Sequence, residues 1–168
     1  IFVNILSLED ASYIVNKWIK VPWINRSGHS ICFANVHMCM EAIDSVKIKL
    51  AINNADLVLM DGKPLSVFMR LMGHKKSIHI RGEDFTKAIC KFACENNYSV
   101  RFYGSTTDNL LKLKNKIVIK YPKIKINLLE SPPFRKLNKE ENDYYINKIN
   151  KQKIDILFIG LGCPKQEI

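Results

Sequence analysis

Short apolar runs that end in turns alternate with helical patterns along the whole chain, and this alternation determines the expected fold class. The clearest run, Leu57 to Met60, predicts a short buried strand that ends at Asp61-Gly62. Before it, apolar residues recur at helical spacing over 8–20, and after it an apolar run over 154–159 predicts another strand. Strands that alternate with helices predict a mostly parallel sheet with helices on both faces, that is, an α/β, Rossmann-like fold.

The same patterns predict the remaining elements. Ser7 and Asp10 are typical of a capping box before the first helix, and Asp84 is the expected cap of a later one. The part of the chain from Ser99 to Gly160 resembles a mononucleotide-binding half of a doubly wound sheet. Further strands are expected at 31–34, 77–80, 99–103 and 124–129, and further helices at about 38–53, 65–72, 85–95, 107–120 and 139–149.

The composition is that of a folded globular protein, with 47% apolar and 25% charged residues. No linker, repeat or low-complexity tract divides the chain, so we expect residues 1–168 to form a single domain. No apolar run approaches the roughly 20 residues that span a bilayer. We expect no signal peptide at the start. Because the chain opens without Met and stops just after a glycine-rich turn, we expect it to be part of a longer protein.

The net charge of +10 indicates attraction to an anionic partner, which leaves nucleic acid, acidic lipid and a phosphate-bearing substrate open. The basic residues are spread along the chain, and this distribution disfavours nucleic acid. The five cysteines form no C-x-x-C pair, although Cys90 and Cys94 would share a helix face. We therefore expect reduced, buried thiols, as in a cytosolic protein.

Asp61 is the best candidate for an acid/base residue. It follows a buried strand directly, so it is expected at the rim of the sheet, where open α/β folds bind ligands. The alternative is an ordinary Asp-Gly turn after a strand. Asn35 is placed in the same way, between the strand at 31–34 and a helix. No nucleophile elbow of the G-x-S-x-G type competes with Asp61 for catalysis.

A glycine-rich turn near the end of the chain is a candidate phosphate site. The backbone amides of Gly160 and Gly162 can approach an anion there, and Lys165 adds positive charge. The turn continues through Pro164 and Gln166, and it matches neither a dinucleotide G-x-G-x-x-G motif nor a P-loop. It is therefore a weak signal when it is taken alone.

A second candidate phosphate site is the turn Gly104-Ser105, whose alternative is an ordinary capped helix. Arg81 is either a phosphate partner or a solvated charge at the end of a strand. Neither His79 nor the other histidines form a metal-binding spacing with carboxylates, and no Asp-x-Asp pair occurs. We therefore expect no metal, and no other cofactor is indicated.

Four segments at the ends of predicted strands form a recognisable set. They are Ala34-Asn35-Val36, Ala55-Asp56 to Asp61-Gly62-Lys63-Pro64-Leu65, Arg81-Gly82-Glu83-Asp84-Phe85 and Ile159-Gly160-Leu161-Gly162-Cys163-Pro164-Lys165-Gln166-Glu167. Together they resemble the WecG/TagA/CpsF glycosyltransferase family, in that family's order and at its spacing. The turn Phe102-Tyr103-Gly104-Ser105 also matches the family's central glycine turn, and the resemblance covers essentially the whole chain.

This resemblance implies an inverting, metal-independent enzyme that moves a sugar, often of the N-acetylmannosamine type, from a UDP-sugar to a polyprenyl-diphosphate-linked acceptor. The products would enter wall teichoic acid, capsule or other exopolysaccharide of bacteria. By the same resemblance Asp61 is the general base, Asn35 and Gln166 line the site, and the turns at Gly104 and 160–162 face UDP. It also implies a cytoplasmic enzyme at the inner face of the membrane and no nucleic-acid partner, with homo-oligomers left open.

The sequence departs from the family pattern in three places. Phe33 stands where members often carry Thr, which is expected to alter the donor pocket. Ile78-His79 stands where many carry Glu-Arg, and we expect Arg81 or His79 to take over the role of that arginine. The family's basic C-terminal extension, which helps to dock the membrane, is not part of these 168 residues. A nucleotide-binding protein without turnover and a basic nucleic-acid-binding domain remain the alternatives.

Overall fold

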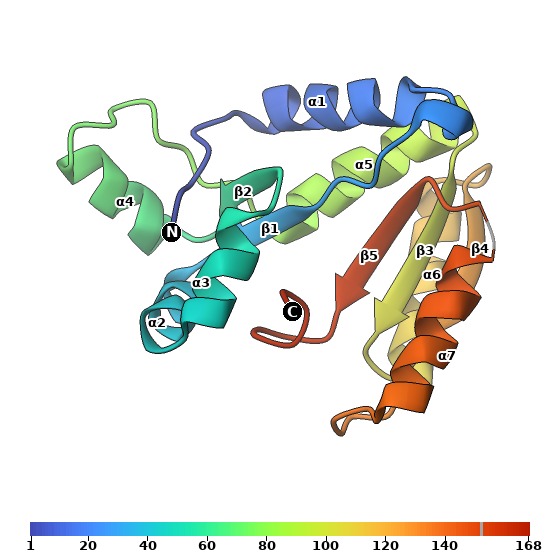
Figure 1. Cartoon of the computed structure of the whole chain (residues 1–168). Coiled ribbons are helices and arrows are strands. Elements are labelled where there is room, and N and C mark those ends of the chain that lie inside the picture. Colours follow the sequence, from blue (N-terminus) through green and yellow to red (C-terminus); the bar gives the residue numbers. More distant parts are fainter. Residues whose placement is uncertain (152) are drawn as a thin grey trace. The chain divides into compact units, whose positions relative to one another are not determined.

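The computed structural model describes residues 1–151 and 153–168 and divides them into two compact units (Figure 1). The first unit comprises Ile1–Ile89 and Gly162–Ile168, and the second comprises Cys90–Leu161. In each unit helices flank parallel strands, so the predicted α/β, Rossmann-like class is confirmed. Each unit also has an apolar core of its own. The single domain expected from composition stays a prediction.

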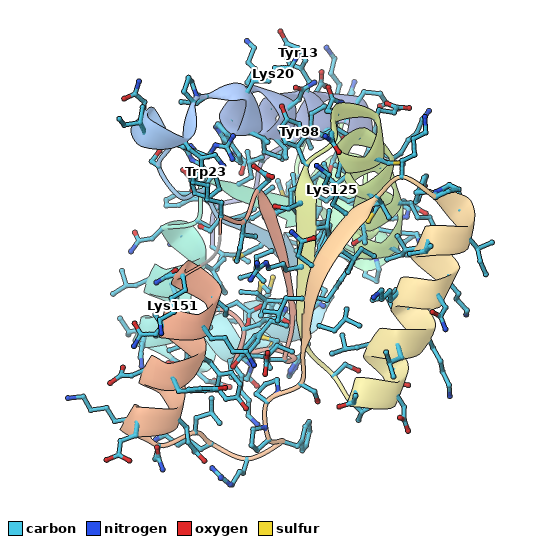
Figure 2. All side chains as sticks on the ribbon, turned by 90° about the vertical axis from the view of Figure 1, so that its right-hand side faces the viewer. Tyr13, Lys20, Trp23, Tyr98, Lys125 and Lys151 are labelled. Atoms are coloured by element: carbon cyan, nitrogen blue, oxygen red, sulfur yellow. The ribbon has the colours of Figure 1, made fainter. Side chains whose placement is uncertain are left out.

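The first unit begins with a helix whose ends follow from its sequence. Its elements are α1 (Leu8–Lys20), η1 (Trp23–Asn25), β1 (Ile31–Ala34), α2 (Val36–Asp44), α3 (Val46–Asn53), β2 (Leu57–Met60), α4 (Lys63–Leu71) and the start of α5 (Gly82–Asn96). The Ser7 hydroxyl accepts from the backbone N–H of Asp10 at 3.0 Å, and the Asp10 carboxylate accepts from Ser7 N–H, so the predicted capping box is confirmed. Ala11 is buried on the inner side of α1, and Tyr13 and Lys20 project from the other side (Figure 2).

Strand β2 is more deeply buried than β1, its partner in the first unit's sheet. It pairs in parallel with β1, from Ile31 opposite Leu57 to Ala34 opposite Met60, and all four of its residues are buried. Asn4 forms a further parallel bridge with Leu59. This complete burial explains why the strand appears in the sequence as a continuous apolar run without alternation.

Two predicted elements of the first unit are wrong. The expected helix over 38–53 is broken at Ser45, which has extended backbone and caps α3 by accepting from Ile48 N–H. The apolar period hid this break, because buried Met38 of α2 and Ile52 of α3 belong to one core cluster. The expected strand over 77–80 does not form, although the N–H of Ile80 donates to the carbonyl of Met60 at 2.7 Å.

A third correction concerns the start of α5. The helix begins at Gly82, so Asp84 lies in its first turn and is not the residue that precedes it. An acidic side chain is favourable in the first turn as well as at the cap, because the exposed N–H groups carry partial positive charge there. The sequence signal was therefore real, but it did not distinguish these two positions. Helix α5 then continues from the first unit into the second.

The second unit is built around β3 (Ser99–Gly104), the middle strand of the parallel order β4-β3-β5. The described elements around β3 are α6 (Thr107–Lys120), β4 (Lys125–Glu130), α7 (Lys139–Asn150) and β5 (Ile156–Gly160). Val100 and Phe102 of β3 are buried in the core, and Phe102 stacks on Phe158 with ring centroids 5.2 Å apart. Lys151 caps the end of α7 (Figure 2), and β4 lies at an edge, as its alternating pattern predicts.

All five cysteines are free thiols, as predicted, but Cys90 alone among them is buried; the other four are half-buried, so the predicted burial is wrong for those four. Among the described residues, no helix combines the length and the apolar content that crossing a membrane requires.

Candidate active site

Asp61 and Asn35 lie at the same edge of the first unit's sheet. Because β1 and β2 are parallel and in register, their carboxyl ends coincide, and the backbone N–H of Asp61 donates to the carbonyl of Ala34 at 2.8 Å. Asn35 is the next residue after Ala34. The two predicted site residues therefore emerge from adjacent strands at the position where open α/β sheets bind ligands.

The side chain of Asn35 is held by the helix that follows it. Its Oδ1 atom accepts from the backbone N–H of Met38 at 2.9 Å and caps α2. This bond satisfies one of the N–H groups that have no partner within the helix. It also fixes the amide in one orientation, so the Nδ2 group of Asn35 is available as a positioned donor. The residue thus has a structural role alongside the proposed binding role.

The Asp61 carboxylate is half-buried and borders the start of α5. A Cβ atom at Gly82 would lie 3.7 Å from Oδ2 of Asp61 and 3.9 Å from the ring of Phe33. Within the part of the chain that the structure describes, no hydrogen bond or ion pair engages this carboxylate. Asp61 is therefore held in place by its backbone, and its oxygens are open to a ligand.

Phe33 occupies the place beside Asp61 and packs against the buried ring of Phe85. The two ring centroids are 5.3 Å apart and the planes meet at 65°, an edge-to-face contact. This contact joins β1 to the first turns of α5 and makes one wall of the site apolar. The departure from the family pattern at Phe33 is therefore accommodated by packing within the first unit.

The last turn of the chain is closed by Gln166. The backbone N–H of Gly162 donates to Oε1 of Gln166 at 3.1 Å, and the N–H of Gln166 donates back to the carbonyl of Gly162 at 3.2 Å. Pro164 follows a cis peptide bond inside this turn, and Lys165 is exposed. The side-chain oxygen of Gln166 is thus used by the turn, while its NH₂ group remains the polar end that can face a ligand.

Cys163, Cys32 and Glu167 form a cluster that sequence reasoning missed. Both thiols pack against the core of the first unit, which anchors the last turn to β1. Burial raises the pKa of the Cys163 thiol to about 11, and the nearby Glu167 carboxylate adds to the increase. Burial and Glu167 also raise the pKa of the Cys32 thiol. The cysteine spacing alone carried no signal for this cluster, because Cys32 lies more than 130 positions before Cys163 and Glu167 in the chain.

The two basic candidates before α5 differ in their surroundings. The guanidinium of Arg81, the residue before α5, pairs with Glu83 at 2.7 Å and lies 3.8 Å from Asp84, and both carboxylates belong to the first turn of the helix. His79 is half-buried in the extended segment that precedes it. A phosphate that bound Arg81 would therefore compete with an existing carboxylate partner.

The second unit contains the other glycine candidates. Gly104 and Gly160 end the adjacent strands β3 and β5 and are partners in the register. Gly104 has a φ of 119°, and a Cβ atom there would lie 2.3 Å from the carbonyl oxygen of Gly160. The next residue, Ser105, donates its N–H to that carbonyl at 3.2 Å and accepts at its own carbonyl from the hydroxyl of Ser131.

Gly104 is therefore required by close backbone approach, whereas Gly160 has open space beside its Cα atom. Thr106 caps α6 by accepting from Asn109 N–H, so the capped-helix alternative for this turn is met. Among the described residues no three His, Cys, Asp or Glu side chains gather where they could hold a metal ion.

These features define the class of the protein: a Rossmann-like α/β chain with a carboxylate and an amide at the carboxyl edge of a parallel sheet. Over residues 1–168 the chain matches the Glycosyl transferase WecG/TagA/CpsF family, and it belongs to that family. The resemblance inferred from the sequence motifs is thereby confirmed.

The chain is also similar to a curated protein of Bacillus spizizenii (strain W23), the N-acetylglucosaminyldiphosphoundecaprenol N-acetyl-beta-D-mannosaminyltransferase. The two are 26% identical over 140 residues, which cover 83% of this chain and 52% of the relative. The chain thus spans about half the length of this relative.

Proposed function

We propose that the chain is the catalytic part of an inverting, metal-independent glycosyltransferase. It moves a sugar, of the N-acetylmannosamine type or a related hexose, from a UDP-sugar to an acceptor linked to polyprenyl diphosphate. Family membership and the printed activity of the Bacillus relative support this proposal. The observation that carries it is the half-buried Asp61 carboxylate, open to a ligand at the carboxyl edge of the sheet.

Asp61 acts as the general base in this reaction. Its carboxylate takes the proton of the acceptor hydroxyl while the hydroxyl oxygen forms a bond to C1 of the donor sugar. The bond from C1 to the diphosphate oxygen breaks on the opposite face, and its electron pair leaves with UDP. Attack and departure on opposite faces invert the configuration at C1. The proton then passes from Asp61 to water.

The negative charge that develops on the leaving diphosphate requires donors and cations around it. We assign this role to the backbone of the turns at Gly104-Ser105 and 160–162, with Lys165 as the first cationic candidate. Arg81 is a second cationic candidate, and a phosphate bound there would compete with its pairing to Glu83. Asn35 and the NH₂ group of Gln166 are assigned to orienting the sugars, since the oxygens of both side chains are already used by backbone N–H groups.

The biological setting follows from this assignment. An acceptor on polyprenyl diphosphate is held in a membrane, so the enzyme works as a peripheral protein at the inner face of the cell membrane. Its product enters the synthesis of a bacterial cell-surface polysaccharide such as teichoic acid, capsule or exopolysaccharide. These statements rest on the proposed acceptor, to which the name of the Bacillus relative points.

Replacing Asp61 with Asn tests the central role of this residue. We expect D61N to bind UDP as the unchanged chain does and to lose transfer by about 10²- to 10⁴-fold, because the amide cannot accept the proton. The matched control is D44N, which neutralises an exposed carboxylate at the end of α2 and should leave transfer unchanged. Equal turnover by D61N and the unchanged chain would contradict the general-base role.

Calorimetric titration with UDP, ADP and GDP, with and without EDTA, tests the nucleotide and the metal requirement. Selective binding of UDP that persists in EDTA is expected. UDP binding without transfer from any UDP-sugar would favour a nucleotide-binding protein that lost turnover. Salt-sensitive binding to random DNA without UDP binding would favour the nucleic-acid alternative, which rests only on the charge of +10.

A further inference from the structure

Helix α4 turns its large apolar side chains toward solvent. It starts two residues after Asp61; Leu65 and Met69 are half-buried, and Leu65 packs against the core of the first unit. On the outer side Phe68 is 57% exposed and Leu71 is 81% exposed. Helix α4 is drawn in green in Figure 1. A helix on the surface of a globular protein normally has the reverse arrangement, with its apolar stripe facing the core.

The exposed apolar residues form one continuous stripe. Val67 and Phe68 lie four and three positions before Leu71, so both share a helix face with it, and exposed Met72 extends this face at its end. Ser66, by contrast, is only 2% exposed. Contiguous exposed apolar surface of this kind marks an interaction site, because its exposure to water is unfavourable.

The chain around α4 is basic throughout. No Asp or Glu occurs between Asp61 and Glu83, whereas five Lys and Arg residues do. The turn 73–76 after the helix lines a shallow hollow of about 400 Å³ with Ile5. Arg70 donates from Nε to the carbonyl of Ser77 at 2.8 Å, which ties this turn to the helix. The five basic residues are Lys63, Arg70, Lys75, Lys76 and Arg81.

We propose that the outer face of α4 and the basic turn 73–76 together dock the protein on an anionic lipid bilayer. Charge complementarity selects this occupant, because an apolar stripe flanked along the chain by cations, with no carboxylate between Asp61 and Glu83, matches acyl chains below negatively charged headgroups. Each Lys or Arg near such a surface adds attraction that salt weakens. A protein partner would have to be both apolar and strongly acidic to fit the same face.

The position of α4 in the chain links this docking surface to the proposed reaction. The helix has nine residues and is therefore about 14 Å long, and Asp61 lies just before its first turn. Docking through α4 would hold the Asp61 carboxylate within about one helix length of the bilayer. This link between docking and catalysis rests on the proposed function, since the proposed acceptor carries its sugar at a membrane surface.

Sedimentation with lipid vesicles tests the apolar part of the surface. The unchanged chain is expected to bind vesicles of mixed phosphatidylglycerol and phosphatidylcholine, and F68S/L71S to bind about tenfold more weakly or worse. Both side chains are exposed, so the fold should persist, and circular dichroism checks this. The control is I43S/V46S, which removes two similarly exposed apolar side chains on α2 and α3 and should bind normally.

A second pair of variants tests the basic turn. K75Q/K76Q should bind anionic vesicles several-fold to about thirtyfold more weakly, and it should match the unchanged chain on phosphatidylcholine alone. K112Q/K116Q on α6 lowers the net charge equally and should bind nearly as the unchanged chain does. Equal losses for the two pairs would mean that the overall charge of +10 attracts the lipid, and the proposal would be wrong.

Unchanged vesicle binding by F68S/L71S would also overturn the proposal. Size-exclusion chromatography with light scattering tests whether a second copy of the chain occupies this face instead. If the unchanged chain self-associates but does not bind vesicles, and F68S/L71S abolishes the self-association, the face is an interface between copies. The same variants are titrated with UDP. Vesicle binding without UDP binding by the unchanged chain would contradict the proposed function and leave the docking surface standing, so the two failures are distinguishable.

Discussion

The carboxyl ends of the strands are held differently in the two units. In the first unit the strand ends carry side chains with chemistry, and the Asp61 carboxylate is placed by its backbone bond to Ala34. In the second unit β3 and β5 end in glycines, and Gly104 is required because the carbonyl oxygen of Gly160 lies where a Cβ atom would be. The first edge should therefore tolerate substitution structurally and lose function, whereas the second should lose the fold itself.

The largest effect on stability is expected for G104A. The methyl group would meet the Gly160 backbone at 2.3 Å, and a φ of 119° is unfavourable for any L side chain, so we expect a loss of about 3 kcal/mol or more. Thermal or urea unfolding measures it. The matched control is G160A, whose methyl group enters open space and should cost far less. Comparable losses for both variants would remove the proposed steric difference between the two glycines.

At the first edge, G82A should act on function and leave the fold intact. The added methyl would be in ordinary van der Waals contact with Asp61 Oδ2 at 3.7 Å, so the melting temperature should change little. It would narrow the space beside the proposed base, and we expect a clear decrease in transfer at unchanged stability. Steady-state kinetics together with a melting curve check this. A large loss of stability would show that the first edge is as sterically constrained as the second.

Substitutions of Asn35 separate its two roles. N35A removes the cap of α2 and should destabilise the protein by about 1 kcal/mol. N35S keeps a capping oxygen and should retain nearly all of the stability, while it loses the amide that we assign to substrate binding. We therefore expect equal losses of transfer but unequal melting temperatures. Full transfer by N35S would leave Asn35 with a capping role alone.

The smallest expected effect is an acid-dependent one in the second unit. Arg135 bonds both carboxylate oxygens of Glu141, at 2.7 and 2.6 Å, and holds the pKa of Glu141 at about 2. Because the pKa of Glu141 is lower in the folded state than its ordinary value of 4.5, the ionised carboxylate stabilises the folded protein at pH values above 4.5. This contribution is lost as the pH falls toward 2.

R135Q should therefore lower the melting temperature by about 1–3 °C at pH 7, since the pair is exposed, and the difference should vanish near pH 2. K136Q removes the neighbouring exposed charge and serves as the control. A difference between R135Q and the unchanged chain that does not depend on pH would contradict the ion-pair explanation.

The elements that the sequence predicted well are those whose signals are local. Ser7 and Asp10 satisfy each other within one turn, and β2 is apolar at every position because it is buried on both faces. The sequence did not reveal the break at Ser45, because α2 and α3 contribute buried residues to one core cluster and the apolar period continues through both helices. The segment 77–80 has a strand-like pattern but forms no strand, because a strand also requires a neighbour that pairs along its length.

The candidate site divides in the same way. Asp61 and Asn35 could be assigned to one edge from the sequence, because parallel strands necessarily share the direction of their ends. The cluster of Cys32, Cys163 and Glu167 could not, since nothing local signals a contact between the first strand and the last turn. The pairing of Arg81 with Glu83 depends on where α5 begins, and the sequence placed that start inaccurately.

The sequence by itself determined the α/β class, the ends of most helices and the identity of the residues at the strand ends. Those properties depend on side-chain size, on hydrogen bonds within a turn and on the period of apolar residues. Only the tertiary structure decided that Gly104 has no room for a side chain and that the apolar residues of α4 face outward. Both depend on which surfaces meet in space, and a periodic pattern does not say which face of a helix is covered.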